Sequence, residues 1–339
     1  MGPTAGAIPD ATSAVVISDS KVAQLYGSAA MSSFEGGSVA PTLIDFPPGE
    51  QHKTLATYGQ LMDALLEISP PIDRSAVVVA LGGGVTGDLA GFVAATALRG
   101  LRWIQCPTTL LADVDASVGG KTAVDHPAGK NMIGAFHQPS AVLIDVDTLK
   151  TLGEIEIRNG LAECVKHAVI RDEGLLGFIE QNAEAICTCD PDVMTEFVAR
   201  NVTIKAAVVA ADEREMDQRA HLNFGHTIGH AIEVFIGYEK IPHGQGVALG
   251  MIVACRMAVN RGIVEGGAEE RIRNILEQLS LPVSWSGLDA QQIWRIMQHD
   301  KKVRGGRVRM ILPSGLGKVE IYDDITEESV REALEAIGP

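Results

Sequence analysis

Short apolar runs alternate with amphipathic segments through the first 150 residues of the chain. Four runs are continuously apolar enough for buried strands, at residues 14–18, 76–81, 103–106 and 141–145, and helical periodicity lies between them at 55–68 and 89–97. Continuous apolar strands that alternate with helices indicate a parallel sheet covered on both faces. We therefore expect an α/β domain over residues 1–150.

The pattern changes at about residue 151, where long helical periodicity takes over in the segments 162–169, 190–212, 246–261 and 267–279. A final helix is expected after Asp324, with Glu327 completing a capping box. The sequence thus predicts a second, all-α domain over residues 151–339. A cleft is expected where the two domains meet.

Composition and charge narrow the range of partners and locations. The 339 residues are 46% hydrophobic and 21% charged, with a net charge of -15 and no long basic run. We expect no nucleic-acid partner and no membrane partner, although local lysines and arginines can still form a pocket for a small anion. The five cysteines form no CxxC pair, which favours reduced thiols. With neither a signal-peptide pattern nor an apolar run of roughly 18–20 residues, we expect a soluble, cytoplasmic protein.

The stretch DASVGGKT, residues 115–122, ends like a phosphate-binding Walker loop. Gly120, Lys121 and Thr122 fit GxxxxGK[ST], but Asp115 stands where the first glycine belongs. A carboxylate at that position would repel the phosphates that such a loop binds. The residues alone therefore leave the role of this stretch open.

A second glycine-rich stretch, GGGVTGD at residues 82–88, lies between a strand pattern and a helix pattern. Gly82, Gly84 and Gly87 satisfy GxGxxG, which lets the backbone approach a pyrophosphate at a helix start. The acid that usually binds ribose about twenty residues later is missing, because Asp113 and Asp115 lie too far along. The pattern favours a nucleotide site in an unusual arrangement, and a simple tight turn is the alternative.

Histidines indicate metal chemistry in the second half of the chain. In NFGHTIGHAIE, residues 223–233, His226 and His230 are four apart and share a helical face. His243 follows at an expected helix start, and Glu163 lies upstream in GLAECVKH. Such nitrogen and oxygen donors would form an open metal site of the catalytic type. A hydrogen-bonded structural histidine pair is the alternative, since the helix lacks HExxH.

Several cations lie near glycines or in apolar surroundings. Lys205 is the most informative, because it lies inside the apolar run VTIKAAVVAA and a buried ammonium needs an anion or a cleft. Each of the others by itself is typical of a solvated side chain: Arg99, Lys121, Lys130, Lys166, Arg219, Lys301 and Lys302.

Together and in this order, these stretches resemble the 3-dehydroquinate synthases. The resemblance covers roughly residues 42–317 and rests on GGGVTGDLAGFVAATALRG, QCPTTLLADVDASVGGKTAVDHPAGKNMIGAFHQP, GLAECVK, RAHLNFGHTIGHAIE, HGQGVALGM and HDKK. It implies a Rossmann-like α/β domain that binds NAD, an all-α domain that binds a metal, a catalytic cleft between them and a homodimer. In that family DASVGGKT lines the cleft between nicotinamide and substrate, so an aspartate is expected there.

The resemblance also implies roles for individual residues. The metal, zinc or cobalt, would be held by Glu163, His226 and His243, with His230 beside it as an active-site histidine rather than a ligand. Catalytic roles fall to His230, Glu215, Lys121, Asn223 and Arg219. Substrate-binding positions are Arg99, Asp115, Asn131, Lys166, Lys205 and Lys301, the last favoured over Lys302. NAD-contacting positions are Asp19, Glu50, Lys53, Gly83, Gly84, Val85, Gly87, Asp88, Thr108, Thr109, Lys130, Thr148 and Thr151.

The implied substrate is an anionic sugar phosphate, 3-deoxy-D-arabino-heptulosonate 7-phosphate, and the implied products are 3-dehydroquinate and phosphate. NAD would oxidise C5 transiently, phosphate would leave by β-elimination, the hydride would return, and ring opening and an aldol closure would follow. Departures from the family pattern are Ala116, Asp125, Gly153 and Ile155. Three alternatives stay open: a sister cyclase with another sugar phosphate, a metal-dependent polyol dehydrogenase, and a non-catalytic NAD-binding regulator.

Overall fold

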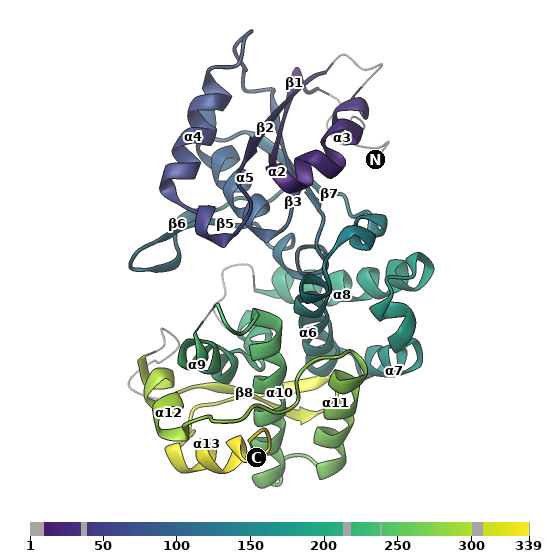
Figure 1. Cartoon of the computed structure of the whole chain (residues 1–339), viewed down its shortest axis with the longest axis vertical. Helices are drawn as coiled ribbons and strands as arrows, with labels where there is room; N and C mark the ends of the chain where they lie inside the picture. Colours follow the sequence, from purple (N-terminus) through teal and green to yellow (C-terminus); the bar gives the residue numbers. More distant parts are fainter. Residues whose placement is uncertain (1–9, 35–38, 213–217, 238, 300–307, 339) are drawn as a thin grey trace. The chain divides into compact units, whose positions relative to one another are not determined.

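The computed structural model describes residues 10–34, 39–212, 218–237, 239–299 and 308–338. The chain divides into two compact units, Met1–Thr151 and Leu152–Pro339 (Figure 1). Each unit buries its own apolar residues.

The first unit is built around a five-stranded parallel sheet, as the sequence predicts. Its strand order is β2-β1-β3-β4-β7. The strands are β1 Ser13–Asp19, β2 Ala40–Phe46, β3 Val77–Gly82, β4 Arg102–Pro107 and β7 Ala141–Val142. The fourth predicted strand is shortened to two residues in β7. β2 was not predicted because it is an edge strand with mostly half-exposed side chains, which leaves no continuous buried run.

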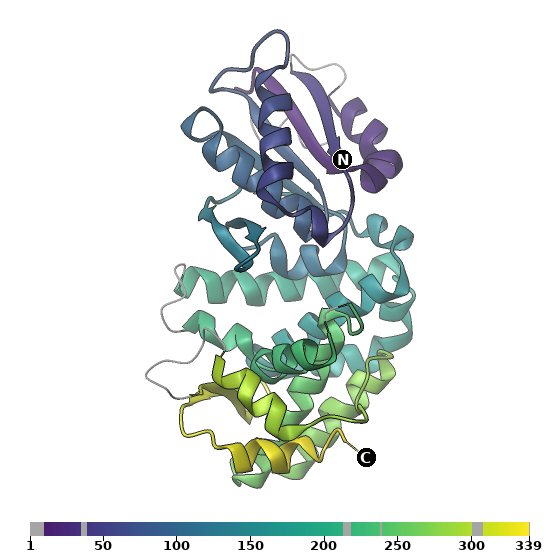
Figure 2. The same cartoon turned by 60° about the vertical axis from the view of Figure 1, so that its left-hand side comes forward.

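Alternate side chains of β1 enter two separate cores, which covers the sheet on both faces as predicted. Val15 and Ile17 pack with α4 (Leu55–Leu66) and α5 (Gly84–Thr96). Ala14 and Val16 pack with side chains of the segment 20–32, which forms α2 Ser20–Val22, η1 Ala23–Gly27 and α3 Ser28–Ser32. Figures 1 and 2 show α4 and α3 on opposite sides of the sheet.

An antiparallel hairpin that the sequence analysis did not predict follows β4. It pairs β5 (Lys121–His126) with β6 (Gly129–Phe136) and packs against α5. Short helical turns complete the unit: η2 Glu50–His52, η3 Ala97–Arg99, η4 Ala112–Ala116 and η5 Val146–Thr151.

The second unit surrounds one buried helix, α10 (His243–Asn260). α10 contacts α6, α9, α11, α13 and β8, and its residues from Val247 to Cys255 are all buried. An all-round apolar helix is typical of such a central position. The other helices are α6 Glu154–Arg171, α7 Glu173–Cys187, α8 Pro191–Ala211, η6 Gln218–Asn223, α9 His226–Ile236, α11 Gly266–Gln278, α12 Ala290–His299 and α13 Glu327–Leu334.

Two expectations for the second unit need correction. The unit is helical but not all-α, because β8 (Met310–Gly315) and β9 (Lys318–Tyr322) form an antiparallel hairpin. The last helix also begins two residues later than expected. Thr326 caps α13 and Ser329 completes the capping box, while Asp324 instead accepts a hydrogen bond from Arg261 at 2.8 Å.

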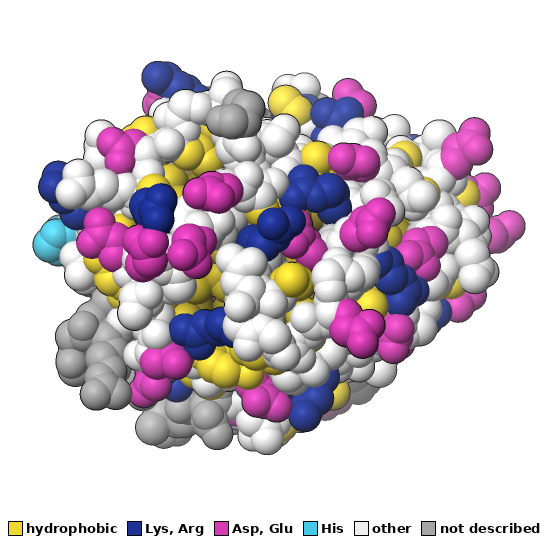
Figure 3. Space-filling model, turned by 90° about the horizontal axis from the view of Figure 1, so that it is seen from below, with side chains coloured by type: hydrophobic (Ala, Val, Ile, Leu, Met, Phe, Trp, Pro, Cys, Tyr) yellow, Lys and Arg dark blue, Asp and Glu magenta, His cyan; other side chains and the backbone are white. Residues whose placement is uncertain are grey.

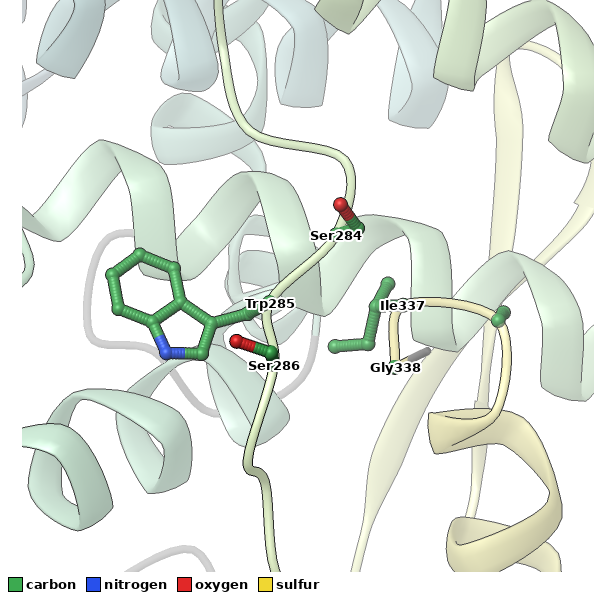
Figure 4. Close-up of a pocket in the computed structure, with 6 residues that line it drawn as sticks. Ser284, Trp285, Ser286, Ile337 and Gly338 are labelled. Carbon is green, nitrogen blue, oxygen red and sulfur yellow. The ribbon is translucent and has the colours of Figure 1, made fainter.

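The surface in Figure 3 mixes acidic and basic side chains, with no broad area of one sign on that face. Local pairs such as Arg331 with Glu328 illustrate this mixing. Among the helices of the described residues, none combines the length and the apolarity that crossing a bilayer requires.

Candidate metal centre and cofactor-binding residues

Three donors from three helices converge in the second unit. Glu163 lies in the middle of α6, His226 is the first residue of α9, and His243 is the first residue of α10. The Nε2 atoms of His226 and His243 lie 3.3 Å and 3.6 Å from Glu163 Oε1. That oxygen is buried and accepts no hydrogen bond from any described residue. A buried carboxylate oxygen facing two imidazole nitrogens fits a divalent cation.

Local structure explains why both histidines start helices. Gly225, with φ 77°, lies in the left-handed region and turns the chain from η6 into α9. His226 Nδ1 then lies 3.1 Å from the carbonyl oxygen of Phe224. At the start of α10, the backbone N–H of Gly244 donates to Asn159 Oδ1 at 3.0 Å, which fixes that helix end against α6.

His230 completes a cluster of three imidazoles. It lies one turn after His226 on α9, and its ring centroid is 5.3 Å from that of His226 and 5.6 Å from that of His243. The nitrogens of these three rings are close enough for a metal as well. The geometry therefore places His230 at the centre without choosing between a ligand and a neighbouring proton carrier.

Buried charges at the centre balance one another. Lys166 forms an ion pair with the second oxygen of Glu163, one turn along α6, and both side chains are almost fully buried. Burial opposes ionisation of Glu163, but the charge of Lys166 outweighs it and holds the pKa well below its usual range. Glu163 is thus an anion ready to bind a cation.

The two histidines differ in protonation. Burial is the main reason that the pKa of His226 is lowered. Burial also opposes protonation of His243, but its carboxylate neighbours Glu163 and Glu233 raise its pKa to about 10. A metal ion at this centre therefore competes with a proton on His243.

Further cations predicted to bind substrate are buried in the same unit. Lys205 of α8 and Arg219 of η6 are 6% and 3% exposed. The elements α6, α8 and η6 contact one another, and Asn223 ends η6 three residues before His226 starts α9. Glu215 and Lys301 lie outside the described residues. The structure thus places Lys166, Lys205 and Arg219 on adjoining elements.

In the first unit, several of the predicted NAD positions follow the carboxyl ends of the parallel strands, where open α/β sheets bind ligands. Gly83 caps α5 directly after β3, and Thr108 follows β4, with its N–H donating to Gly82 O at 3.1 Å. A Cβ on Gly83 would lie 3.1 Å from Thr109. Asp19 ends β1 and accepts the Thr86 hydroxyl at 3.5 Å. Gly84, Val85, Gly87 and Asp88 form the first turns of α5.

A second group of predicted positions is joined by ion pairs. Lys53 pairs with Asp88 and donates to Asn131 Oδ1 at 2.5 Å. Lys130 pairs with Glu50 at 3.2 Å. The unusual Asp125 accepts the Asn131 N–H at 2.7 Å, which an asparagine oxygen could do equally well. This departure from the family pattern therefore preserves the local contact.

Thr148 and Thr151, predicted to contact NAD, share a partner that the sequence analysis missed. The Tyr26 hydroxyl lies 3.2 Å from Thr148 O and 2.7 Å from Thr151 Oγ1. Tyr26 lies 122 positions from Thr148 and 125 from Thr151 in the sequence, so only the fold could reveal this contact.

The DASVGGKT stretch has the wrong local structure for a Walker loop. Asp115 lies in the turn η4, and Gly119 and Gly120 adopt φ of 108° and 62°, which lead the chain into β5 at Lys121. A Walker loop leads into a helix whose N-terminus binds phosphate. The predicted substrate residues Arg99 and Asn131 also have positive φ, 68° and 55°. Such strained positions concentrate at functional sites.

Comparison with known protein families decides the identity of the chain. Profiles described as "3-dehydroquinate synthase N-terminal" and "3-dehydroquinate synthase C-terminal" match residues 43–159 and 160–303. The chain belongs to the 3-dehydroquinate synthase family. The 3-dehydroquinate synthase of Symbiobacterium thermophilum is 45% identical over 332 residues, covering 97% of this chain and 92% of the relative. That of Desulforamulus reducens is 46% identical over 321 residues, covering 94% and 89%.

Two solved structures of related sugar-phosphate cyclases share the fold of this chain. The 2-epi-5-epi-valiolone synthase of Streptomyces hygroscopicus, solved with NAD+ and Zn2+, has a TM-score of 0.87 and 28% identity, covering 96% of this chain and 91% of its own. A 2-deoxy-scyllo-inosose synthase with carbaglucose-6-phosphate, NAD+ and Co2+ has a TM-score of 0.86 and 28% identity, covering 97% and 92%. A glycerol dehydrogenase of Schizosaccharomyces pombe, 16% identical, shares the fold alone.

These comparisons confirm the predicted fold class and activity. The function is that of a 3-dehydroquinate synthase of the shikimate pathway, a phosphorus–oxygen lyase (EC 4.2.3.4). The chain is 45% identical to a 3-dehydroquinate synthase but only 28% identical to the valiolone synthase, a sister cyclase. This difference disfavours the alternative sugar-phosphate substrates.

Proposed function

We propose that this chain carries out 3-dehydroquinate synthesis from 3-deoxy-D-arabino-heptulosonate 7-phosphate with NAD and one divalent ion, zinc or cobalt. The observation that carries the proposal is the donor set of Glu163, His226 and His243, in which a buried carboxylate oxygen faces two Nε2 atoms. Structural relatives with NAD+ and Zn2+ or Co2+ support the choice of cofactors.

When bound, the ion polarises the substrate hydroxyl and NAD accepts and returns a hydride. Glu163, His226 and His243 would hold the ion. Lys166 keeps Glu163 ionised, so the carboxylate is a ligand at neutral pH. Gly83, Gly84, Val85, Gly87 and Asp88 at the start of α5 would bind the cofactor, with Asp19, Glu50, Lys53, Thr108, Thr109, Lys130, Thr148 and Thr151 around it.

The remaining predicted residues would recognise and activate the substrate. Its carboxylate and phosphate need local positive charge in an acidic protein, and Lys205 and Arg219 are buried cations of the second unit. Arg99, Asp115, Lys121 and Asn131 of the first unit would complete recognition, together with Lys166, Asn223 and Lys301. His230, beside the ligand imidazoles, would move protons with Glu215 during elimination and ring closure.

The proposed assembly is a homodimer, and the proposed location is the cytoplasm. Both rest on membership of the 3-dehydroquinate synthase family.

The test is a coupled assay with heptulosonate phosphate, catalytic NAD and zinc. Equal release of phosphate and 3-dehydroquinate, without net NADH and abolished by a chelator, is the expected result. Activity only with another sugar phosphate would assign the chain to a sister cyclase. Net NADH without phosphate release would indicate a polyol dehydrogenase, and no turnover with any substrate would leave a non-catalytic NAD-binding protein.

A further inference from the structure

A second buried acid lies behind the metal centre and has no role in the proposal so far. Glu233 is near the end of α9 and is 4% exposed. Its Oε1 lies 3.0 Å from Nδ1 of His243. An acid that is this deeply buried needs a specific partner, and His243 provides one.

The His243 ring lies between two carboxylates. Its Nδ1 faces Glu233, and its Nε2 faces Glu163 Oε1 at 3.6 Å. A neutral imidazole carries one proton, so donation of Nδ1–H to Glu233 leaves the Nε2 lone pair directed at the metal position. His226 differs, because its Nδ1 lies 3.1 Å from the backbone carbonyl oxygen of Phe224 rather than beside a carboxylate.

Close packing of two helices fixes the Glu233 side chain. A Cβ on Gly246 of α10 would lie 2.7 Å from Glu233 Oε1, so the carboxylate rests directly on the backbone of that helix. A Cβ on Gly229 of α9 would lie 2.7 Å from Gly246 O. Glycines at both positions therefore let α9 approach α10 closely enough for Glu233 to reach His243.

We propose that Glu233 is a positioning residue that accepts the Nδ1 proton of His243 and thereby presents Nε2 to the divalent ion. It orients the ring, fixes its tautomer and increases its basicity, without contacting the substrate or the ion. This inference rests on the proposed metal site and adds a residue to it.

The test compares zinc affinity of the metal-free full-length protein and its variants, by competition with a chromogenic chelator. Glu233→Ala should weaken zinc binding about 10–100-fold, because the ring loses its orienting acceptor. Glu233→Gln keeps an acceptor oxygen but not the charge, so its loss should be smaller. If the alanine protein does not fold, Glu233→Asp tests the same point, since its shorter side chain withdraws the oxygens from Nδ1.

The matched control is Glu269→Ala. Glu269 of α11 is equally buried, at 5% exposed, but it pairs with two arginines instead of a histidine. Its partners are Arg256 of α10 at 2.6 Å and Arg273 of α11 at 3.1 Å. It should lower the melting temperature and leave zinc affinity unchanged. Wild-type zinc affinity in folded Glu233→Ala, or the same loss in both variants, would overturn the role of Glu233. Failure of the wild-type protein to bind zinc would overturn the metal site itself together with this inference.

Discussion

Gly250 of α10 lies against the carbonyl oxygen of Gly225, which precedes α9, so closely that a methyl group on Gly250 would overlap that oxygen. The same methyl group would come within 2.8 Å of the Gly229 nitrogen. His226 and His243, the two histidines proposed as metal ligands, each start one of these helices. The crossing of α9 and α10 therefore sets the distance between His226 and His243.

Gly250→Ala should lower the free energy of unfolding by about 3 kcal/mol, because well-packed backbones cannot separate without loss of contacts elsewhere. Urea denaturation measures this change. Gly267→Ala on α11 is the control, since nothing lies within 4 Å of its added Cβ. Equal behaviour of the two variants would contradict the importance of the close crossing.

His243→Ala should abolish both metal retention and turnover, because it removes one of the three proposed ligands. Metal content after gel filtration, measured by elemental analysis, checks the first effect. The exposed His126, on the β5–β6 hairpin of the other unit, is the control, and His126→Ala should retain metal. A fully metallated and active His243→Ala protein would rule out the ligand assignment.

Lys121→Ala should lower turnover at least about 100-fold while the protein stays folded. Lys121 is exposed at the first position of β5, so its loss removes no core contact. Activity assays together with circular dichroism separate the two effects. The control is Lys318→Ala, which removes an exposed lysine paired with Glu320 and should leave turnover unchanged. Normal turnover of Lys121→Ala would remove this residue from the proposed machinery.

Asp113 predicts a pH dependence of stability. Both carboxylate oxygens are buried and have no hydrogen-bond partner among the described residues. Burial, together with the nearby charge of Asp145, raises the pKa of Asp113 to about 8. In the unfolded chain an aspartate has a pKa of about 3.9. At pH values between about 3.9 and about 8, the folded protein therefore holds a proton on Asp113 that the unfolded chain has lost. The unfolding free energy therefore falls as pH rises, by at most about 1.4 kcal/mol per pH unit.

Asp113→Asn removes this titration. Its unfolding free energy should depend less steeply on pH between 5 and 8 than that of the wild-type protein, as measured by urea denaturation at several pH values. Comparison of slopes cancels any constant effect of the amide. Parallel profiles would show that Asp113 does not hold the proton.

Lys53 and Asp88 should be energetically coupled. The side chain of Lys53 is 5% exposed, and its loss in Lys53→Met would leave Asp88, at 22% exposed, without its cation. We expect a loss on the order of 2 kcal/mol, discounted for the partial exposure of Asp88. The double variant with Asp88→Asn should lose less than the sum of the two single variants. A strictly additive double-mutant cycle would show that the ion pair contributes no coupling.

The sequence by itself determined the α/β class of the first unit, the mainly helical character of the second unit and the types of chemistry present. Continuous apolar runs at 76–81 and 103–106 can be satisfied only inside a covered sheet, and the glycines of 82–88 follow directly from a strand into a helix. These signals are local, so periodicity and spacing are sufficient to detect them. The histidines at 226 and 243 were visible for the same reason, although spacing alone could not choose between His230 and His243 as ligands.

Only the tertiary structure decided what depends on distant residues. The edge strand β2 and the strand β9 escaped prediction because their exposed or mixed side chains give no continuous buried run. β8 was also missed, although its first four residues are buried. Glu233 was not singled out by its sequence, because its contact with His243 depends on the distance between two helix axes. That distance is set by glycine contacts between α9 and α10, which no local pattern in the sequence encodes.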